Sequence, residues 1–216
     1  MPPQAAPSMT SQAEFPGAPE EYVALGARMA PGDQRNPLEL LDGLQGWLRS
    51  RAGEEGKGWA QLLDADSVAG ARHLASAVLH AERARQEGRA HLTDPGAELA
   101  LYLAGWDQLS PALGRVGLRE DSHSFVVVTS PGEWASPLLE ALNLEPDPEA
   151  FPRAPSERTM ARLGFSSADL RSVPPERWEL LALELVALTD LPGSGPHHMP
   201  GKGGAGPSGR PAANNL

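Results

Sequence analysis

The chain contains no cysteine among its 216 residues. Disulfide bonds, thiolate nucleophiles and thiolate metal sites are therefore excluded. No apolar run approaches the length that a transmembrane helix needs. The first ten residues also lack the basic and apolar regions of a signal peptide, so we expect a cytoplasmic protein with no contact to membranes.

Basic residues are scarce as well. Lys and Arg number 18 against 28 Asp and Glu, which gives a net charge of −10. Nonspecific binding to nucleic acid requires an excess of basic residues, so this balance disfavours it. One local basic patch remains compatible with the composition.

The two ends of the chain differ from its middle. Residues 1–19 are rich in Pro, Ala, Ser and Gln, and residues 192–216 consist mainly of Gly, Pro, Ser and Asn. Neither segment has enough apolar residues to build a core, so we expect a disordered leader and a disordered tail. The remaining residues, 20–191, are predicted to form a single domain.

The middle alternates between strand-like and helix-like patterns. Short apolar or β-branched runs predict strands at 22–27, 59–63 and 124–129. Helical spacing predicts helices at 37–48, 68–86, 97–104, 110–117, 133–142, 155–170 (two short helices) and 176–189. The segment 97–104 is apolar nearly all round, which indicates a buried central helix. We expect an α/β (α+β) fold with a small mixed sheet of about three to four strands packed with about seven helices.

The usual motifs of catalysis are missing. Gly201-Lys202 lacks the earlier glycine of a phosphate-binding loop, and no Gly-x-Ser-x-Gly elbow occurs. His73 and His80 lie seven residues apart on one predicted helix, which is too far for a shared metal ion. We therefore expect no metal, no cofactor and no catalytic residue, although a small-molecule enzyme with an unrecognised site stays open.

Two predicted surfaces remain as candidates for binding a partner. Between residues 71 and 120 every basic residue is an arginine, which suits phosphate contacts, although ion pairs on a solvated face are the simpler interpretation. The last predicted helix has one apolar arc that contains Leu181, Leu185 and Leu188, and a second arc that contains Leu180 and Leu183. One arc can bury in the domain, and the other needs either more core or a partner.

Four blocks of sequence resemble the small kinase-binding subunit of the KEOPS complex, a family known in eukaryotes as the PRPK-binding protein. Residues 70–81 (GARHLASAVLHA) resemble its G-x-x-H-L-x-x-A helix, and residues 98–105 (ELALYLAG) resemble its E-x-x-L-Y-L-S/A-G helix. Residues 108–118 (QLSPALGRVGL) and 179–191 (ELLALELVALTDL) resemble its third and closing segments. The four blocks occur in the order of the family.

The resemblance implies a non-catalytic interaction subunit. KEOPS installs a threonylcarbamoyl group on an adenosine of tRNA, and its transferase and kinase-like ATPase hold the active sites. The small subunit binds and stimulates the kinase directly, meets the transferase only indirectly, and helps to hold tRNA by its 3′ CCA end. Carried over to this chain, the resemblance implies that the kinase-binding residues are Leu181, Leu185 and Leu188. It implies that the RNA-binding residues are Arg72, His73, Arg83, Gln108 and Arg115.

One position departs from the family. Its members often have a basic residue before the Gln of the third block, whereas this chain has Asp107. A carboxylate repels a phosphate path, so RNA contact at that point is in doubt. The alternative hypothesis is a free-standing RNA-binding module that uses the arginine-bearing helix without a kinase, which the acidic net charge disfavours.

Overall fold

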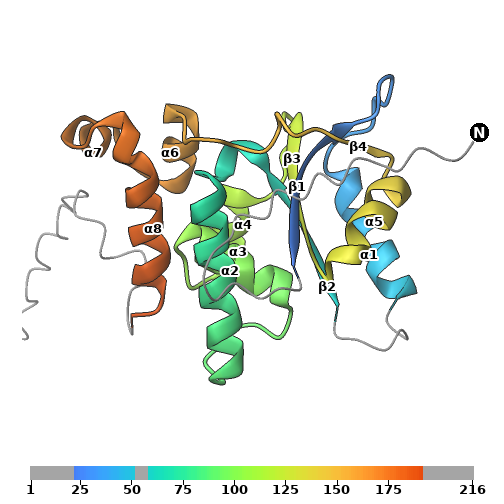
Figure 1. The fold of residues 1–216 in the computed structure, drawn as a ribbon, viewed down its shortest axis with the longest axis horizontal. Coiled ribbons are helices and arrows are strands. Elements are labelled where there is room, and N and C mark those ends of the chain that lie inside the picture. Colours follow the sequence, from blue (N-terminus) through green and yellow to red (C-terminus); the bar gives the residue numbers. More distant parts are fainter. Residues whose placement is uncertain (1–21, 52–57, 192–216) are drawn as a thin grey trace, which may run out of the picture.

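The structure is a computed structural model that describes residues 22–51 and 58–191. In these residues, eight α-helices pack on the two faces of one four-stranded sheet (Figure 1). This confirms the predicted α/β class and the small sheet packed with helices. The two segments predicted to be disordered, 1–19 and 192–216, lie outside the described residues.

The strands lie in the order β2-β3-β1-β4, and every pairing is antiparallel. Their bounds are β1 Val23–Met29, β2 Trp59–Asp64, β3 Ser124–Ser130 and β4 Leu144–Pro146. The expectation of a mixed sheet is therefore wrong, because an alternation of strands and helices does not by itself fix strand direction. The sequence also gave no sign of β4, which is three residues long and ends in a proline that cannot donate to a ladder.

Successive residues of the central strand β3 face two separate apolar clusters. Phe125 and Val127 belong to the cluster on the side of α1 (Glu39–Ser50) and α5 (Ala135–Ala141). Val126 and Val128 point to the opposite cluster, which the remaining helices cover. The β-branched run is thus buried on both faces, as side chains that alternate along a strand between two helical layers must be.

The larger helical layer contains α2 (Ala71–Gln86), α3 (Pro95–Ala104) and α4 (Leu109–Val116). Every residue of α3 from Glu98 to Ala104 is buried, which confirms the prediction of a buried central helix. The helix starts where Asp94 accepts a hydrogen bond from the Ala97 amide at 2.7 Å, and it ends at Gly105 in the left-handed conformation.

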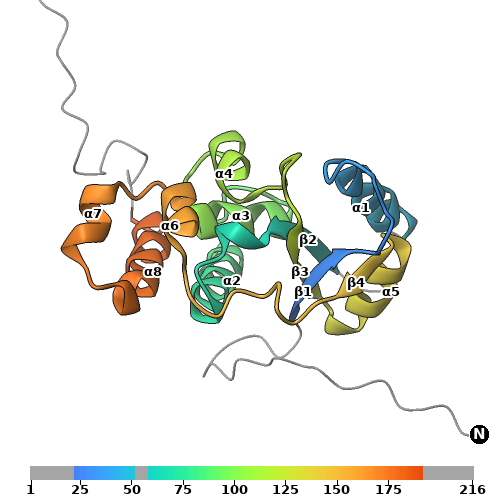
Figure 2. The same cartoon turned by 90° about the horizontal axis from the view of Figure 1, so that it is seen from above.

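The rest of this layer is formed by α6 (Glu157–Leu163), α7 (Ser167–Ser172) and α8 (Trp178–Thr189). Ser156 and Ser166 cap α6 and α7 with reciprocal capping boxes, which define the start of each short helix. Figures 1 and 2 place α7 and α8 at one end of the long axis and α1 and α5 at the other. Helix α8 is therefore a peripheral helix that has neighbours on one side.

Candidate functional site

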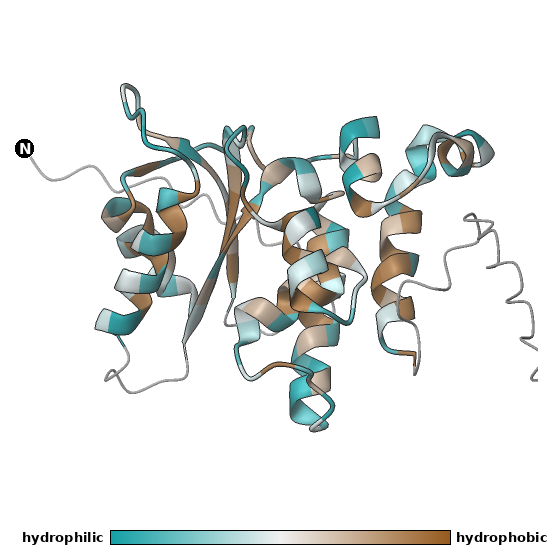
Figure 3. Cartoon of the chain, turned by 180° about the vertical axis from the view of Figure 1, so that it is seen from behind, coloured by the Kyte–Doolittle hydropathy of each residue, from teal (hydrophilic) through white to brown (hydrophobic). Residues whose placement is uncertain are grey.

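The side of α8 that faces away from the domain carries exposed leucines on either side of one exposed carboxylate, Glu184. Leu180, Leu188 and Leu191 are 48%, 44% and 54% exposed, the highest values among the described large apolar residues. Leu180 and Leu188 lie on one side of the helix with Leu183, Glu184 and Ala187 by steps of 100°. We call this side the α8 outer face, and Leu191 follows it just beyond the end of the helix. The helix is coloured hydrophobic over most of its length in Figure 3. Apolar surface gathered in this way is typical of a protein-binding site.

The opposite side of α8 is part of the core. Trp178, Ala182, Leu185 and Val186 are buried, and the helix packs against α2 and α3. The predicted kinase-binding leucines are therefore divided between the two sides. Leu188 lies on the outer face, Leu181 is half-buried, and Leu185 is only 6% exposed.

The prediction for Leu185 requires a correction, because its side chain is not available to a partner. A Cβ added at Gly105 would come within 2.2 Å of the Leu185 side chain, so Leu185 fills the space at the end of α3. The residues that were missed are Leu180 and Leu191. The second apolar arc in the sequence contained Leu180, but periodicity does not say which arc faces inward.

A polar cluster fixes the end of α8 to its neighbours. The Asp190 carboxylate accepts a hydrogen bond from the Tyr102 hydroxyl of α3 at 2.7 Å and one from the Arg89 guanidinium at 3.3 Å. Its other oxygen lies 2.5 Å from Nδ1 of His80 on α2. Asp190, the residue that follows α8, is therefore held by Tyr102 of α3, His80 of α2 and Arg89 just after α2.

The protonation of this cluster follows from its contacts. Burial acts to raise the pKa of Asp190, but the hydrogen bonds from Tyr102, His80 and Arg89 outweigh it and lower the pKa below the usual range. Burial and the neighbouring carboxylate of Asp190 raise the pKa of Tyr102. Asp190 is therefore an anion and Tyr102 a hydrogen-bond donor at neutral pH, which keeps the end of α8 fixed.

Arg72, at the start of α2, is the first of the predicted RNA-binding residues. Its side chain is exposed, and its guanidinium lies 3.7 Å from the Glu179 carboxylate on α8. An exposed pair at this distance contributes little to stability and is easily exchanged for another anion. Arg72 can therefore bind a phosphate group, but it then loses its contact with Glu179 on α8.

His73 is a core residue and cannot contact RNA directly. It is fully buried, and its Nδ1 accepts a hydrogen bond from the Ala69 amide at 3.1 Å. Burial lowers the pKa of His73 to about 4, with the backbone of Leu103 acting in the opposite direction. The imidazole is thus neutral at pH 7, and its hydrogen bond with the Ala69 amide fixes the turn that leads into α2. The prediction of an RNA contact at His73 is wrong for this structural reason.

Arg115 is also part of the internal structure. Its guanidinium donates to the backbone carbonyls of Ala104, at 3.3 Å, and Leu163, at 2.5 Å. It also lies over the Trp106 ring, 4.7 Å from the centroid, and burial lowers its pKa. Arg115 therefore connects the ends of α3 and α6, and using it to bind RNA would require giving up these bonds.

Arg83 and Gln108 remain accessible. Both are exposed, and Arg83 has no ion-pair partner among residues 22–51 and 58–191. Arg83 and Arg72 fall on one stripe of α2, while Gln108 precedes α4 without capping it through its side chain. Of the five residues expected to bind RNA, the structure leaves Arg72, Arg83 and Gln108 able to do so.

Residues 22–51 and 58–191 contain no group of three or more His, Asp or Glu that could hold a metal ion. A helix with the length and apolarity to span a membrane is also absent from these residues.

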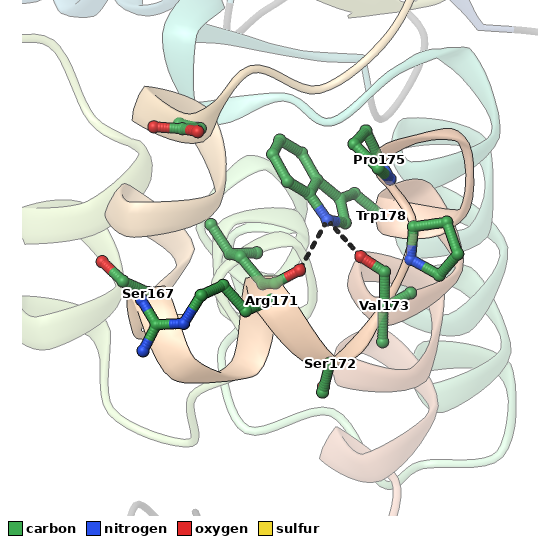
Figure 4. A pocket seen from close by; sticks show the side chains of 9 residues that line it. Ser167, Arg171, Ser172, Val173, Pro175 and Trp178 are labelled. Carbon is green, nitrogen blue, oxygen red and sulfur yellow. Dashed lines mark hydrogen bonds between the residues drawn. The ribbon is translucent and has the colours of Figure 1, made fainter.

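A pocket of about 730 Å³ opens where α6, α7 and the start of α8 meet (Figure 4). Its apolar lining comes from Leu170, Val173, Pro174, Pro175 and Trp178, and its polar lining comes from Glu157, Ser167, Arg171 and Ser172. The Trp178 indole donates to the backbone carbonyls of Val173, at 3.1 Å, and Leu170, at 3.4 Å. The aromatic ring is thereby fixed in the wall of the pocket.

No protein-family model matches the chain, and no curated protein matches it.

Proposed function

We propose that the chain is a cytoplasmic, non-catalytic subunit of the KEOPS complex that binds and stimulates the kinase/ATPase subunit through the α8 outer face. In the same proposal, it helps to recruit tRNA by the 3′ CCA end for threonylcarbamoyladenosine formation. The observation that carries the proposal is the group of exposed leucines formed by Leu180 and Leu188 on α8 and Leu191 just after it.

The size of this face suits a partner. Each fully buried leucine side chain contributes about 1.5–3 kcal/mol relative to exposure. Three leucines that are about half exposed therefore leave a few kcal/mol unused in the isolated chain. Interfaces obtain most of their affinity from a few apolar anchors of this kind. A partner that covers Leu180, Leu188 and Leu191 recovers this energy.

The polar contacts behind the face also support the proposal. Tyr102, in the second resembling block, and Asp190, in the closing block, are hydrogen-bonded to each other. His73, in the first block, is buried between α2 and α3. The bond between Tyr102 and Asp190 positions the end of α8 against the domain. His73 is a core residue, so the resembling blocks contribute structure, in keeping with a subunit whose work is done by its surfaces.

The tRNA part of the proposal rests on Arg72, Arg83 and Gln108. They come from α2 and from the residue before α4, and all three are exposed. The free-standing RNA-binding alternative is weaker, because most of the neighbouring arginines are engaged. Arg85 pairs with Glu82, and Arg89 pairs with Glu87 and Asp190. Few free cations mean few released counterions, and hence weak binding without a supporting complex.

The proposal is tested by light scattering after size-exclusion chromatography of the full chain mixed with the KEOPS kinase subunit from the same genome. We expect a stable complex that the double variant Leu180→Glu, Leu188→Glu disrupts, because two charges would have to be desolvated in the interface. Leu38→Glu is the matched control, since Leu38 is 38% exposed and precedes α1 at the far end of the domain.

Circular dichroism establishes that both variants fold. Two separate peaks for the wild-type proteins at tens of micromolar would refute kinase binding. Steeply salt-dependent binding of tRNA to the chain alone would then make the RNA-binding module the better hypothesis.

A further inference from the structure

We draw no further inference here: the strongest candidate, the buried side-chain cluster where the Arg162 guanidinium of α6 meets the Asp64 carboxylate at the end of β2, pairs its two charges with each other at 2.6 Å in the core, and nothing in the structure shows a ligand that would reach them.

Discussion

Helices α3 and α8 have almost the same composition and opposite surroundings. Both are apolar nearly all round, with a single acidic residue in α3 and two in α8. Seven consecutive residues of α3 are buried, and its one carboxylate, Glu98, accepts hydrogen bonds from the amides of His91 and Leu92 at 3.2 and 2.9 Å. On α8, by contrast, Leu180 and Leu188 face outward.

The difference shows that the domain covers the apolar side chains of α3 on all sides and those of α8 on one side only. A helix that is apolar on all sides is stable only when all sides are covered. The fold provides that cover for α3 from the sheet, α2, α4 and α8. For α8 it provides cover on one side only, and the uncovered side is the one to which we assign the partner.

The largest effect is expected within α8, where Leu185 and Leu188 lie on different sides. Leu185→Glu buries a charge against Gly105, so we expect a loss of more than about 3 kcal/mol in the free energy of unfolding, or failure to fold. Leu188→Glu should change that free energy by no more than about 0.5 kcal/mol. Urea unfolding followed by circular dichroism measures both, and similar losses would contradict the division of α8 into two sides.

A direct comparison of the two helices comes next. Leu103→Ala on α3 removes a fully buried side chain and should cost about 2–5 kcal/mol, whereas Leu180→Ala on α8 should cost less than about 1 kcal/mol. Chemical denaturation gives both values. A large loss in the α8 variant would mean that Leu180 is covered within the chain itself.

A smaller, pH-dependent effect is expected from His73, which is fully buried in the first turn of α2. Burial lowers its pKa to about 4 in the folded state, against the usual 6.5 of a solvated histidine, so the unfolded state binds more protons between these pH values. Stability should therefore fall as the pH drops from about 7 to 5, with about 2 kcal/mol of the loss due to this residue. His73→Asn keeps an acceptor for the Ala69 amide and should show a correspondingly smaller loss. Identical pH profiles in urea denaturation would show that His73 is not buried in neutral form.

Much of the fold could be predicted from local signals. The pairing of Asp94 and Pro95 marked the start of α3, and the run of β-branched residues marked β3. Strand direction depends on the path of the chain in space and could not be predicted. β4 could not be predicted because it takes its strand geometry from pairing with Ala27, Arg28 and Met29 rather than from its own three residues.

The site residues were harder to predict for one physical reason. Periodicity shows that a helix has an apolar side, but the side that faces inward is decided by its neighbours. Nothing in the sequence of α8 therefore separates buried Leu185 from exposed Leu188. Likewise, an arginine or histidine counts as exposed until a structure shows buried partners for it. The carbonyls of Ala104 and Leu163 that bind Arg115 are distant in sequence, and no pattern in the sequence indicates them.

The contacts between α2 and α8 have one further consequence. Arg72 pairs with Glu179 at one end of α8, and His80 contacts Asp190 at the other, so the two helices are joined at both ends. A phosphate that takes Arg72 has to release Glu179, which alters one of the two attachments of the helix that bears the outer face. Nucleic acid at α2 and a protein on α8 would then influence each other's affinity, and thermodynamic reciprocity requires that influence to be equal in both directions.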